Sequence, residues 1–74
     1  MTDMLFIQQV PDYLYMKYGV RRTRRAVSYW TWVGLMGLNR RVYLRTELTK
    51  DNQLFTRKPW VDYFIFQVSR RKRA

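Results

Sequence analysis

The sequence contains no cysteine and no histidine, and only five of its 74 residues are acidic. Without cysteine there can be no disulfide and no thiolate metal site. Without histidine the chain lacks the commonest metal ligand and the usual general base. Because the few carboxylates are spread along the chain, we expect no metal site, no cofactor, no small-molecule substrate and no catalytic centre. The protein is therefore predicted not to be an enzyme.

Long hydrophobic runs are also missing. The longest stretch without charge, residues 26–39, is too short and too polar to span a bilayer. The N-terminal segment Met1-Thr2-Asp3 carries an acidic residue, Asp3, and no long apolar stretch follows it, so we expect no secretory signal. We therefore expect no membrane partner and a cytoplasmic location, associated with the nucleoid of a bacterial host cell.

Cations and aromatic side chains are abundant. Fifteen Lys and Arg residues, most of them Arg, give a formal net charge of +10. Such a charge indicates a polyanionic partner, either nucleic acid or an anionic membrane surface, and the planar guanidinium suits phosphates and guanine edges. A hydrophobic content of 47% and an aromatic content of 18% favour a folded domain over a disordered basic tail. A soluble basic protein with no polyanion partner is the alternative.

Hydrophobic spacing and turn residues predict an α+β fold with three short helices and a β-hairpin. Pro11 and Gly19 bound a first helix over about 11–18, and Thr23 is the expected N-cap of a second over about 24–33. Pro59 opens a third helix that ends near Val68. Tyr15 is expected on the same helix face as two members of the core. The predicted core consists of Leu14, Tyr18, Val27, Trp30, Trp60, Phe64 and Ile65.

The expected hairpin joins a strand over residues 41–48 to a strand over 54–57, through a polar turn at 50–53. Gly34 and Gly37 should end the second helix and loosen the loop that follows it. Residues 1–9 then form an N-terminal arm or short edge strand, residues 10–68 the domain, and residues 69–74 a basic tail.

Four arginines lie within residues 21–25, next to the apolar, aromatic stretch 26–33. A helix N-terminus already carries partial positive charge, so cations there indicate that an anion binds, most simply a phosphate backbone. Two helices with a tight turn predict a helix-turn-helix whose second helix enters the major groove. The candidate DNA contacts are Arg21, Arg22, Thr23, Arg24, Arg25, Ser28, Tyr29 and Thr31, with Arg40, Arg41, Lys50, Asn52, Gln53 and Arg57 from the hairpin region.

Other interpretations of these patterns remain open at this point. The alternative for the arginines is the solvated face of an ordinary helical pair, and the hairpin turn either contacts DNA or only closes the core. Aromatic side chains could stack on single-stranded bases, for which Tyr29, Trp32, Tyr43 and Phe55 are the candidates. The tail cations contact phosphates, a membrane or a protein, or stay solvated; they are Arg70, Arg71, Lys72 and Arg73.

Two segments resemble a known family. Residues 19–20 and 24–30, with Gly34 and Met36, are similar to the turn and recognition helix of small winged-helix excisionases and of the related MerR-like and AlpA-type regulators. Residues 54–65 are similar to that group's second wing strand leading into its closing helix. Residues 21–23 look like an insertion in the turn, and the hairpin wing is longer than usual. The resemblance implies a winged helix-turn-helix, three short helices with a hairpin wing, that binds double-stranded DNA without catalysing a reaction.

The same resemblance implies a function. Members of the family bind repeated sites beside an attachment site, often as cooperating neighbouring copies, and bend the DNA so that the integrase favours excision of a phage or mobile element. Residues 69–74 would correspond to the family's integrase-contacting segment. The alternatives are a small phage transcriptional repressor, a protein-binding inhibitor or adaptor that uses an aromatic surface, and an RNA-binding basic protein.

Overall fold

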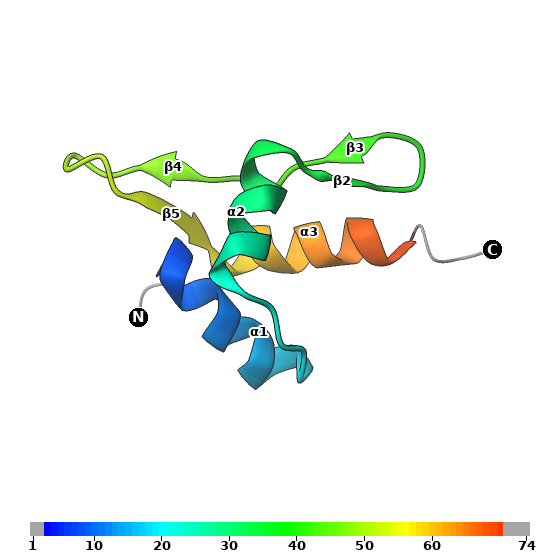
Figure 1. The fold of residues 1–74 in the computed structure, drawn as a ribbon, viewed down its shortest axis with the longest axis horizontal. Coiled ribbons are helices and arrows are strands. Elements are labelled where there is room, and N and C mark those ends of the chain that lie inside the picture. The colour runs from blue at the N-terminus through cyan, green and yellow to red at the C-terminus, as the bar shows by residue number, and fades with distance from the viewer. Residues whose placement is uncertain (1–2, 71–74) are drawn as a thin grey trace.

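The computed structural model describes residues 3–70, without the side chain of Arg70, so the side chains of the predicted tail contacts lie outside what it describes; these are Arg70, Arg71, Lys72 and Arg73. The described chain is an α+β fold of three α-helices and two small antiparallel sheets (Figure 1). Its elements are β1 (Met4–Phe6), the 3₁₀ turn η1 (Ile7–Gln9), α1 (Val10–Tyr18), α2 (Arg24–Trp32), β2 (Leu35–Met36), β3 (Arg41–Val42), β4 (Glu47–Leu48), β5 (Leu54–Arg57) and α3 (Lys58–Arg70).

Local sequence signals set the ends of the helices. Pro11 lies in the first turn of α1, and Gly19 ends that helix in the left-handed conformation, with φ of 67°. The Thr23 hydroxyl accepts a hydrogen bond from the backbone N–H of Ala26 at 3.1 Å, which confirms it as the N-cap of α2. The third helix contains Pro59 in its first turn but begins at Lys58 and runs to Arg70, so it is longer than predicted.

The larger sheet has the strand order β1–β5–β4, with both pairs antiparallel. The N-terminal strand β1 forms one edge, where Leu5 lies opposite Thr56 of the central strand. Strand β4 forms the other edge and is joined to β5 by the turn over 49–53, where the predicted polar turn is found. Asn52 in this turn has φ of 63°, a left-handed conformation that Asn tolerates better than most residues.

The prediction of one continuous strand over residues 41–48 is wrong. Strand β3 pairs with β2 in a separate two-stranded sheet, and only residues 47–48 pair with β5. The intervening segment leaves the ladder because the core captures it. The Leu44 N–H donates to the Trp30 carbonyl at 3.1 Å, and the Leu44 side chain is buried. The Thr56 hydroxyl donates to the Arg45 carbonyl at 2.7 Å, which supplies a partner for that backbone oxygen.

The prediction that Gly34 and Gly37 loosen the loop after α2 is wrong. These glycines allow close packing in the β2–β3 hairpin. Gly34 has φ of 80°, and a Cβ there would lie 2.6 Å from the Val42 carbonyl oxygen. A Cβ on Gly37 would lie 2.7 Å from a methyl group of the same valine. Both distances are too short for a larger residue, so the two sides of the hairpin approach closely at these glycines.

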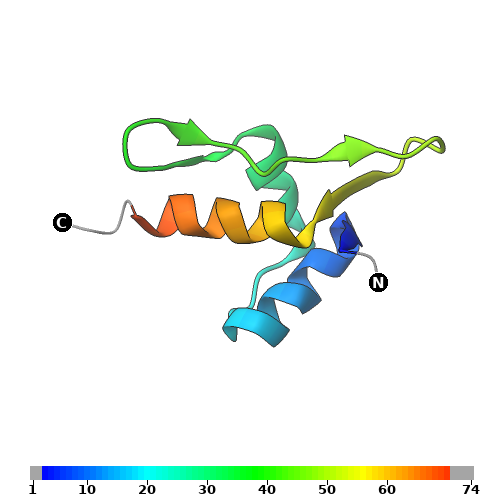
Figure 2. The same ribbon diagram turned by 180° about the vertical axis from the view of Figure 1, so that it is seen from behind.

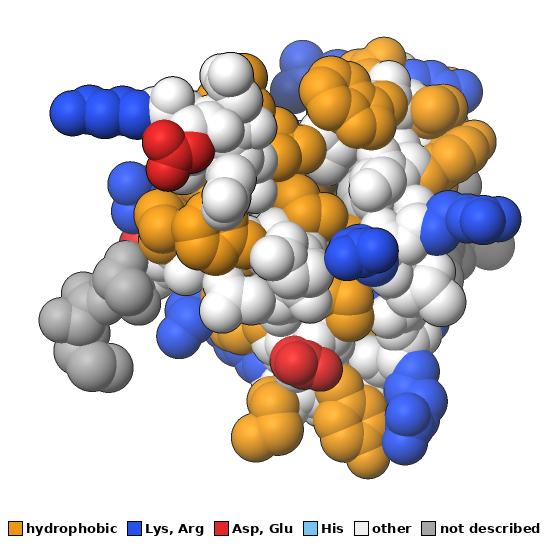
Figure 3. Space-filling model, turned by 60° about the vertical axis from the view of Figure 1, so that its left-hand side comes forward, with side chains coloured by type: hydrophobic (Ala, Val, Ile, Leu, Met, Phe, Trp, Pro, Cys, Tyr) orange, Lys and Arg blue, Asp and Glu red, His pale blue; other side chains and the backbone are white. Residues whose placement is uncertain are grey.

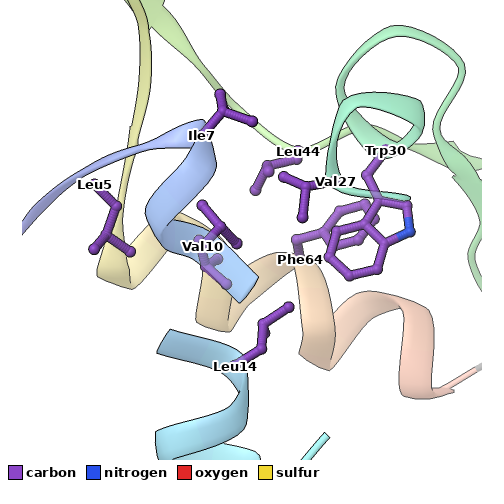
Figure 4. Close-up of a cluster of buried hydrophobic side chains, with 9 residues drawn as sticks. Leu5, Ile7, Val10, Leu14, Val27, Trp30, Leu44 and Phe64 are labelled. Carbon is purple, nitrogen blue, oxygen red and sulfur yellow. The ribbon is translucent and has the colours of Figure 1, made fainter. Parts of the chain in front are cut away.

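The core lies between α1, α2, α3 and the larger sheet (Figure 4). The predicted members Leu14, Val27, Trp30 and Phe64 are buried, and the Trp30 and Phe64 rings pack with centroids 5.2 Å apart. Unpredicted members are Leu5, Ile7, Val10, Leu44, Phe55 and Val61.

The other residues predicted to lie in the core are not fully buried. Trp60 and Ile65 are half-buried. Tyr18 is 38% exposed and Tyr15 is 48% exposed, so the predicted apolar face of the first helix is wrong. Leu14 shares the buried face with Val10 instead.

A carboxylate on α3 explains the position of Tyr18. Asp62 accepts hydrogen bonds from the hydroxyls of Tyr13 and Tyr18 and from the Lys17 ammonium, each at 2.7 Å. Burial alone would raise the pKa of Asp62, but the bonds from Lys17, Tyr18 and Tyr13 outweigh it and hold the pKa below its usual value. We call Tyr13, Lys17, Tyr18 and Asp62 the α1–α3 anchor.

Candidate nucleic-acid interface

The second helix has one face in the core and one in solvent. Successive residues of an α-helix turn by about 100°, so positions three and four apart share a face. Val27 and Trp30 are buried on one side. The opposite side, which we call the outer α2 face, carries Arg24, Arg25, Ser28, Tyr29 and Trp32.

Cations dominate the beginning of the outer α2 face. Arg24 and Arg25 are exposed, and within residues 3–70 neither has an ion pair, a hydrogen-bond acceptor or an aromatic ring as partner of its guanidinium. The first turn of α2 contains no acidic residue. The charges therefore add to the partial positive charge of the helix N-terminus, which makes this end favourable for an anion.

The linker arginines are partly engaged within the protein. The guanidinium of Arg21 lies over the Tyr15 ring, 4.7 Å from its centroid. Arg22 donates to the Arg21 carbonyl at 2.7 Å. Both residues are exposed and lie directly before α2, so their charge remains beside that of Arg24.

The hydroxyl groups of the two threonines predicted to contact DNA form hydrogen bonds with the backbone of α2. Thr23 caps α2, and the Thr31 hydroxyl donates to the Val27 carbonyl at 3.2 Å while the residue is half-buried. Ser28 is half-buried as well, whereas Tyr29 is 49% exposed. Of the predicted contacts that belong to α2, Arg24, Arg25 and Tyr29 are thus the ones best placed to reach a partner.

Two hairpins project from opposite sides of α2, as Figures 1 and 2 show from the two sides of the molecule. The β4–β5 turn presents Lys50, Asn52 and Gln53, all of which are exposed. The β2–β3 turn presents Arg40, also exposed. Among the described residues no acceptor or ring engages the Lys50 ammonium or the Arg40 guanidinium.

Arg41 and Arg57 have clear structural partners. Arg41 donates to the carbonyls of Val33 and Gly34 at 3.1 and 3.3 Å, and so satisfies backbone oxygens at the end of α2. Arg57 pairs with Asp3 at 2.7 Å and lies over the Trp60 ring. These two predicted contacts are thus already engaged in holding secondary-structure elements together.

Of the four aromatic residues considered for base stacking, one is buried and three are exposed. Phe55 is only 7% exposed and belongs to the interior, so it is not available for stacking. Trp32 is 70% exposed, Tyr43 53% and Tyr29 49%. In Figure 3, cationic side chains along the right of the molecule lie below hydrophobic side chains gathered at the upper right. The sequence interpretation missed the β2–β3 hairpin, which brings Tyr43 to the C-terminal end of α2.

The described chain contains neither a metal-binding cluster nor a membrane span. Residues 3–70 bring together no group of three acidic side chains that could hold a metal ion. None of the helices over these residues has the length and apolar character needed to cross a membrane. No family model, no curated protein and no solved structure matches the sequence or the fold.

Proposed function

We propose that this protein is a winged helix-turn-helix that binds double-stranded DNA through the N-terminal end of the outer α2 face, where Arg24 and Arg25 lie. The observation that carries the proposal is the pair Arg24 and Arg25 at the N-terminus of a helix that contains no acid, exposed and without a partner among residues 3–70. Both guanidinium groups add positive charge to the positive end of the α2 dipole, which is unfavourable for folding and favours an anion from outside the chain. A phosphate backbone supplies regularly spaced negative charge at that position.

The arrangement around α2 supports this mode of binding. Helices α1 and α2 with the linker over 19–23 provide the helix-turn-helix, and the β4–β5 hairpin provides a wing with Lys50 at its turn. In such modules the first residues of the second helix reach phosphates and base edges while a flanking element contacts the backbone. Arg40 on the opposite hairpin would add a phosphate contact on the other side of α2.

The size of the module favours an architectural role with several copies on one site. A single helix and wing bury roughly 600–1,000 Å² of protein surface on DNA, which limits specificity. Neighbouring copies on repeated sites would increase specificity and bend the DNA, as an excisionase-like factor does to promote excisive recombination with its integrase. A monomer in sedimentation that gives cooperative footprints would support this role, whereas a tight free dimer on one palindrome would favour a phage repressor.

The DNA-binding proposal is tested by salt dependence. Fluorescence anisotropy with labelled duplex DNA at several salt concentrations gives a log–log slope that reports phosphate contacts. Replacing both residues, Arg24→Ala with Arg25→Ala, should weaken binding and flatten the slope by about 1.8, twice the value of about 0.9 per phosphate.

A control variant that loses the same two charges distinguishes an effect of the outer α2 face from an effect of net charge. Arg45→Ala with Lys58→Ala also removes two cations, which lie over the Trp60 and Tyr13 rings and not on α2. Equal weakening by both double variants would mean that only net charge matters. No binding of the parent to duplex DNA at low salt would refute the proposal.

A further inference from the structure

The far end of the outer α2 face is aromatic and not cationic. Trp32 is the most exposed large aromatic side chain among residues 3–70, at 70%, and it ends α2. Tyr29 lies four residues after Arg25, and Trp32 lies three residues after Tyr29, so the three side chains lie along one stripe. The aromatic surface is therefore continuous with the cationic surface proposed to bind DNA.

Tyr43 comes to the same end of the helix from the β2–β3 hairpin. A Cβ built on Gly34 would lie 3.0 Å from Cδ2 of the Tyr43 ring, so that ring lies against the residues that directly follow α2. The neighbouring Leu44 N–H donates to the Trp30 carbonyl, which fixes the segment alongside the last turn of the helix. Tyr43 is held in this position by buried neighbours, yet remains 53% exposed.

We propose that Trp32 and Tyr43 stack on unpaired bases, so that the preferred ligand is duplex DNA adjoining a short unpaired segment. This inference rests on the proposed function. In an intact duplex the base faces are covered by their neighbours and only base edges line the grooves, whereas an unpaired base exposes a face on which an aromatic ring can stack. Stacking on aromatic side chains is the usual way in which proteins bind bases that have left the helix.

The dimensions of α2 place the two contacts on one ligand. Arg25 and Trp32 are separated by about 10 Å along the helix axis, at 1.5 Å per residue. That distance corresponds to about three base-pair steps of DNA at 3.4 Å each. Arginines at the start of α2 would hold the phosphates of the duplex while the aromatic rings receive bases a few steps away. The surrounding cations and the absence of acid on α2 favour DNA over a protein partner here.

The test compares three labelled DNAs of the same length by anisotropy: an uninterrupted duplex, the same duplex with a short single-stranded gap, and the single strand. The parent protein should bind the gapped duplex most tightly. Trp32→Ala should weaken that binding by roughly 5- to 150-fold, the range for loss of one stacked base, and change binding to the intact duplex by less than about twofold. Trp32→Phe keeps an aromatic face and should retain most of the preference. Quenching of tryptophan fluorescence by the gapped DNA should disappear in Trp32→Phe, because Trp30 is buried and Trp60 half-buried.

Tyr63→Ala is the matched control, because Tyr63 is 59% exposed but lies on α3. It should leave all three affinities unchanged. Equal affinity of the parent for gapped and intact duplex, or equal weakening of both by Trp32→Ala, would overturn the inference and leave duplex binding in place. Binding to none of the three DNAs would overturn both proposals and leave the aromatic surface as a contact for another protein.

Discussion

The α1–α3 anchor and the outer α2 face use similar residues in opposite ways. In the anchor, Lys17 and two tyrosines surround the Asp62 carboxylate, and every polar side-chain group has a partner. On the outer α2 face, Arg24 and Arg25 lie beside Tyr29 and Trp32, and no acid is present in the helix. The polar groups of the anchor are explained by folding, whereas those of the outer α2 face are not.

This difference separates stability from binding. Among residues 3–70 no buried side-chain nitrogen or oxygen lacks a hydrogen-bond partner, so unsatisfied polar groups are confined to the surface. Changes in the core or the anchor should therefore lower stability and affect DNA binding only through unfolding. Changes on the outer α2 face should alter binding and leave the fold intact.

The largest effect is expected beneath the outer α2 face. Trp30 is 6% exposed and packs on Phe64, so Trp30→Ala should lower the free energy of unfolding by about 3–5 kcal/mol. A domain of this size has little more stability than that to lose. Thermal melts followed by circular dichroism test this, with Trp32→Ala as a control expected to change stability by at most about 0.5 kcal/mol. A parent-like melt for Trp30→Ala would show that this packing is not needed.

A smaller loss is expected in the anchor. Asp62→Ala removes the acceptor of three hydrogen bonds, but the carboxylate is 33% exposed, so we expect a loss of about 1–3 kcal/mol. Urea unfolding measures the change, and Asp51→Ala, in the exposed β4–β5 turn, serves as the control. At temperatures where both variants are folded, their affinity for duplex DNA should not fall. Weaker binding by folded Asp62→Ala would contradict the separation of the two regions.

The sequence predicts those features whose causes are local. Thr23 caps α2 through a bond to Ala26 three residues away, and Gly19 ends α1 by its own backbone freedom. Both appear in the sequence as start and stop signals. The exposed arginines of α2 were found in the same way, because cations at a helix start are conspicuous against the apolar stretch that follows.

The features that were missed depend on distant contacts. Tyr18 has the spacing of a core residue, but its hydroxyl bonds to a carboxylate 44 residues along the chain. The strand over 41–48 is divided because the core captures Leu44, and no local signal shows that capture. Arg57 looks like any other hairpin cation until β1 brings Asp3 beside it.

The pH dependence of stability should report the anchor. The pKa of Asp62 is lowered in the fold, so its contribution is present above the unfolded value near 3.9 and is lost as pH falls through the lower folded pKa. Burial, and then the bond to Asp62, raise the pKa of Tyr18 to about 12, so stability should also fall as pH rises from about 10 toward 12. Melting temperatures measured across pH test both the acid and the alkaline loss of stability. Asp62→Asn should reduce the fall in melting temperature at low pH. An unchanged fall would mean that another carboxyl is responsible.

The smallest expected effect on stability has the opposite sign. Arg24→Ala with Arg25→Ala removes two adjacent cations from the positive end of α2 and introduces the residue with the highest helix propensity. Neither guanidinium has a partner among residues 3–70, so no contact is lost. The free energy of unfolding should therefore rise by about 0.3–1 kcal/mol, most clearly at low salt, where repulsion is least screened.

Urea unfolding at two salt concentrations measures this change in free energy. Lys50→Ala, which removes an exposed cation outside any helix, serves for comparison. A loss of stability would show that these arginines support the fold, and the contrast between the anchor and the outer α2 face would then fail. A gain in stability together with weaker DNA binding would show that the arginines are unfavourable for folding and needed for the ligand.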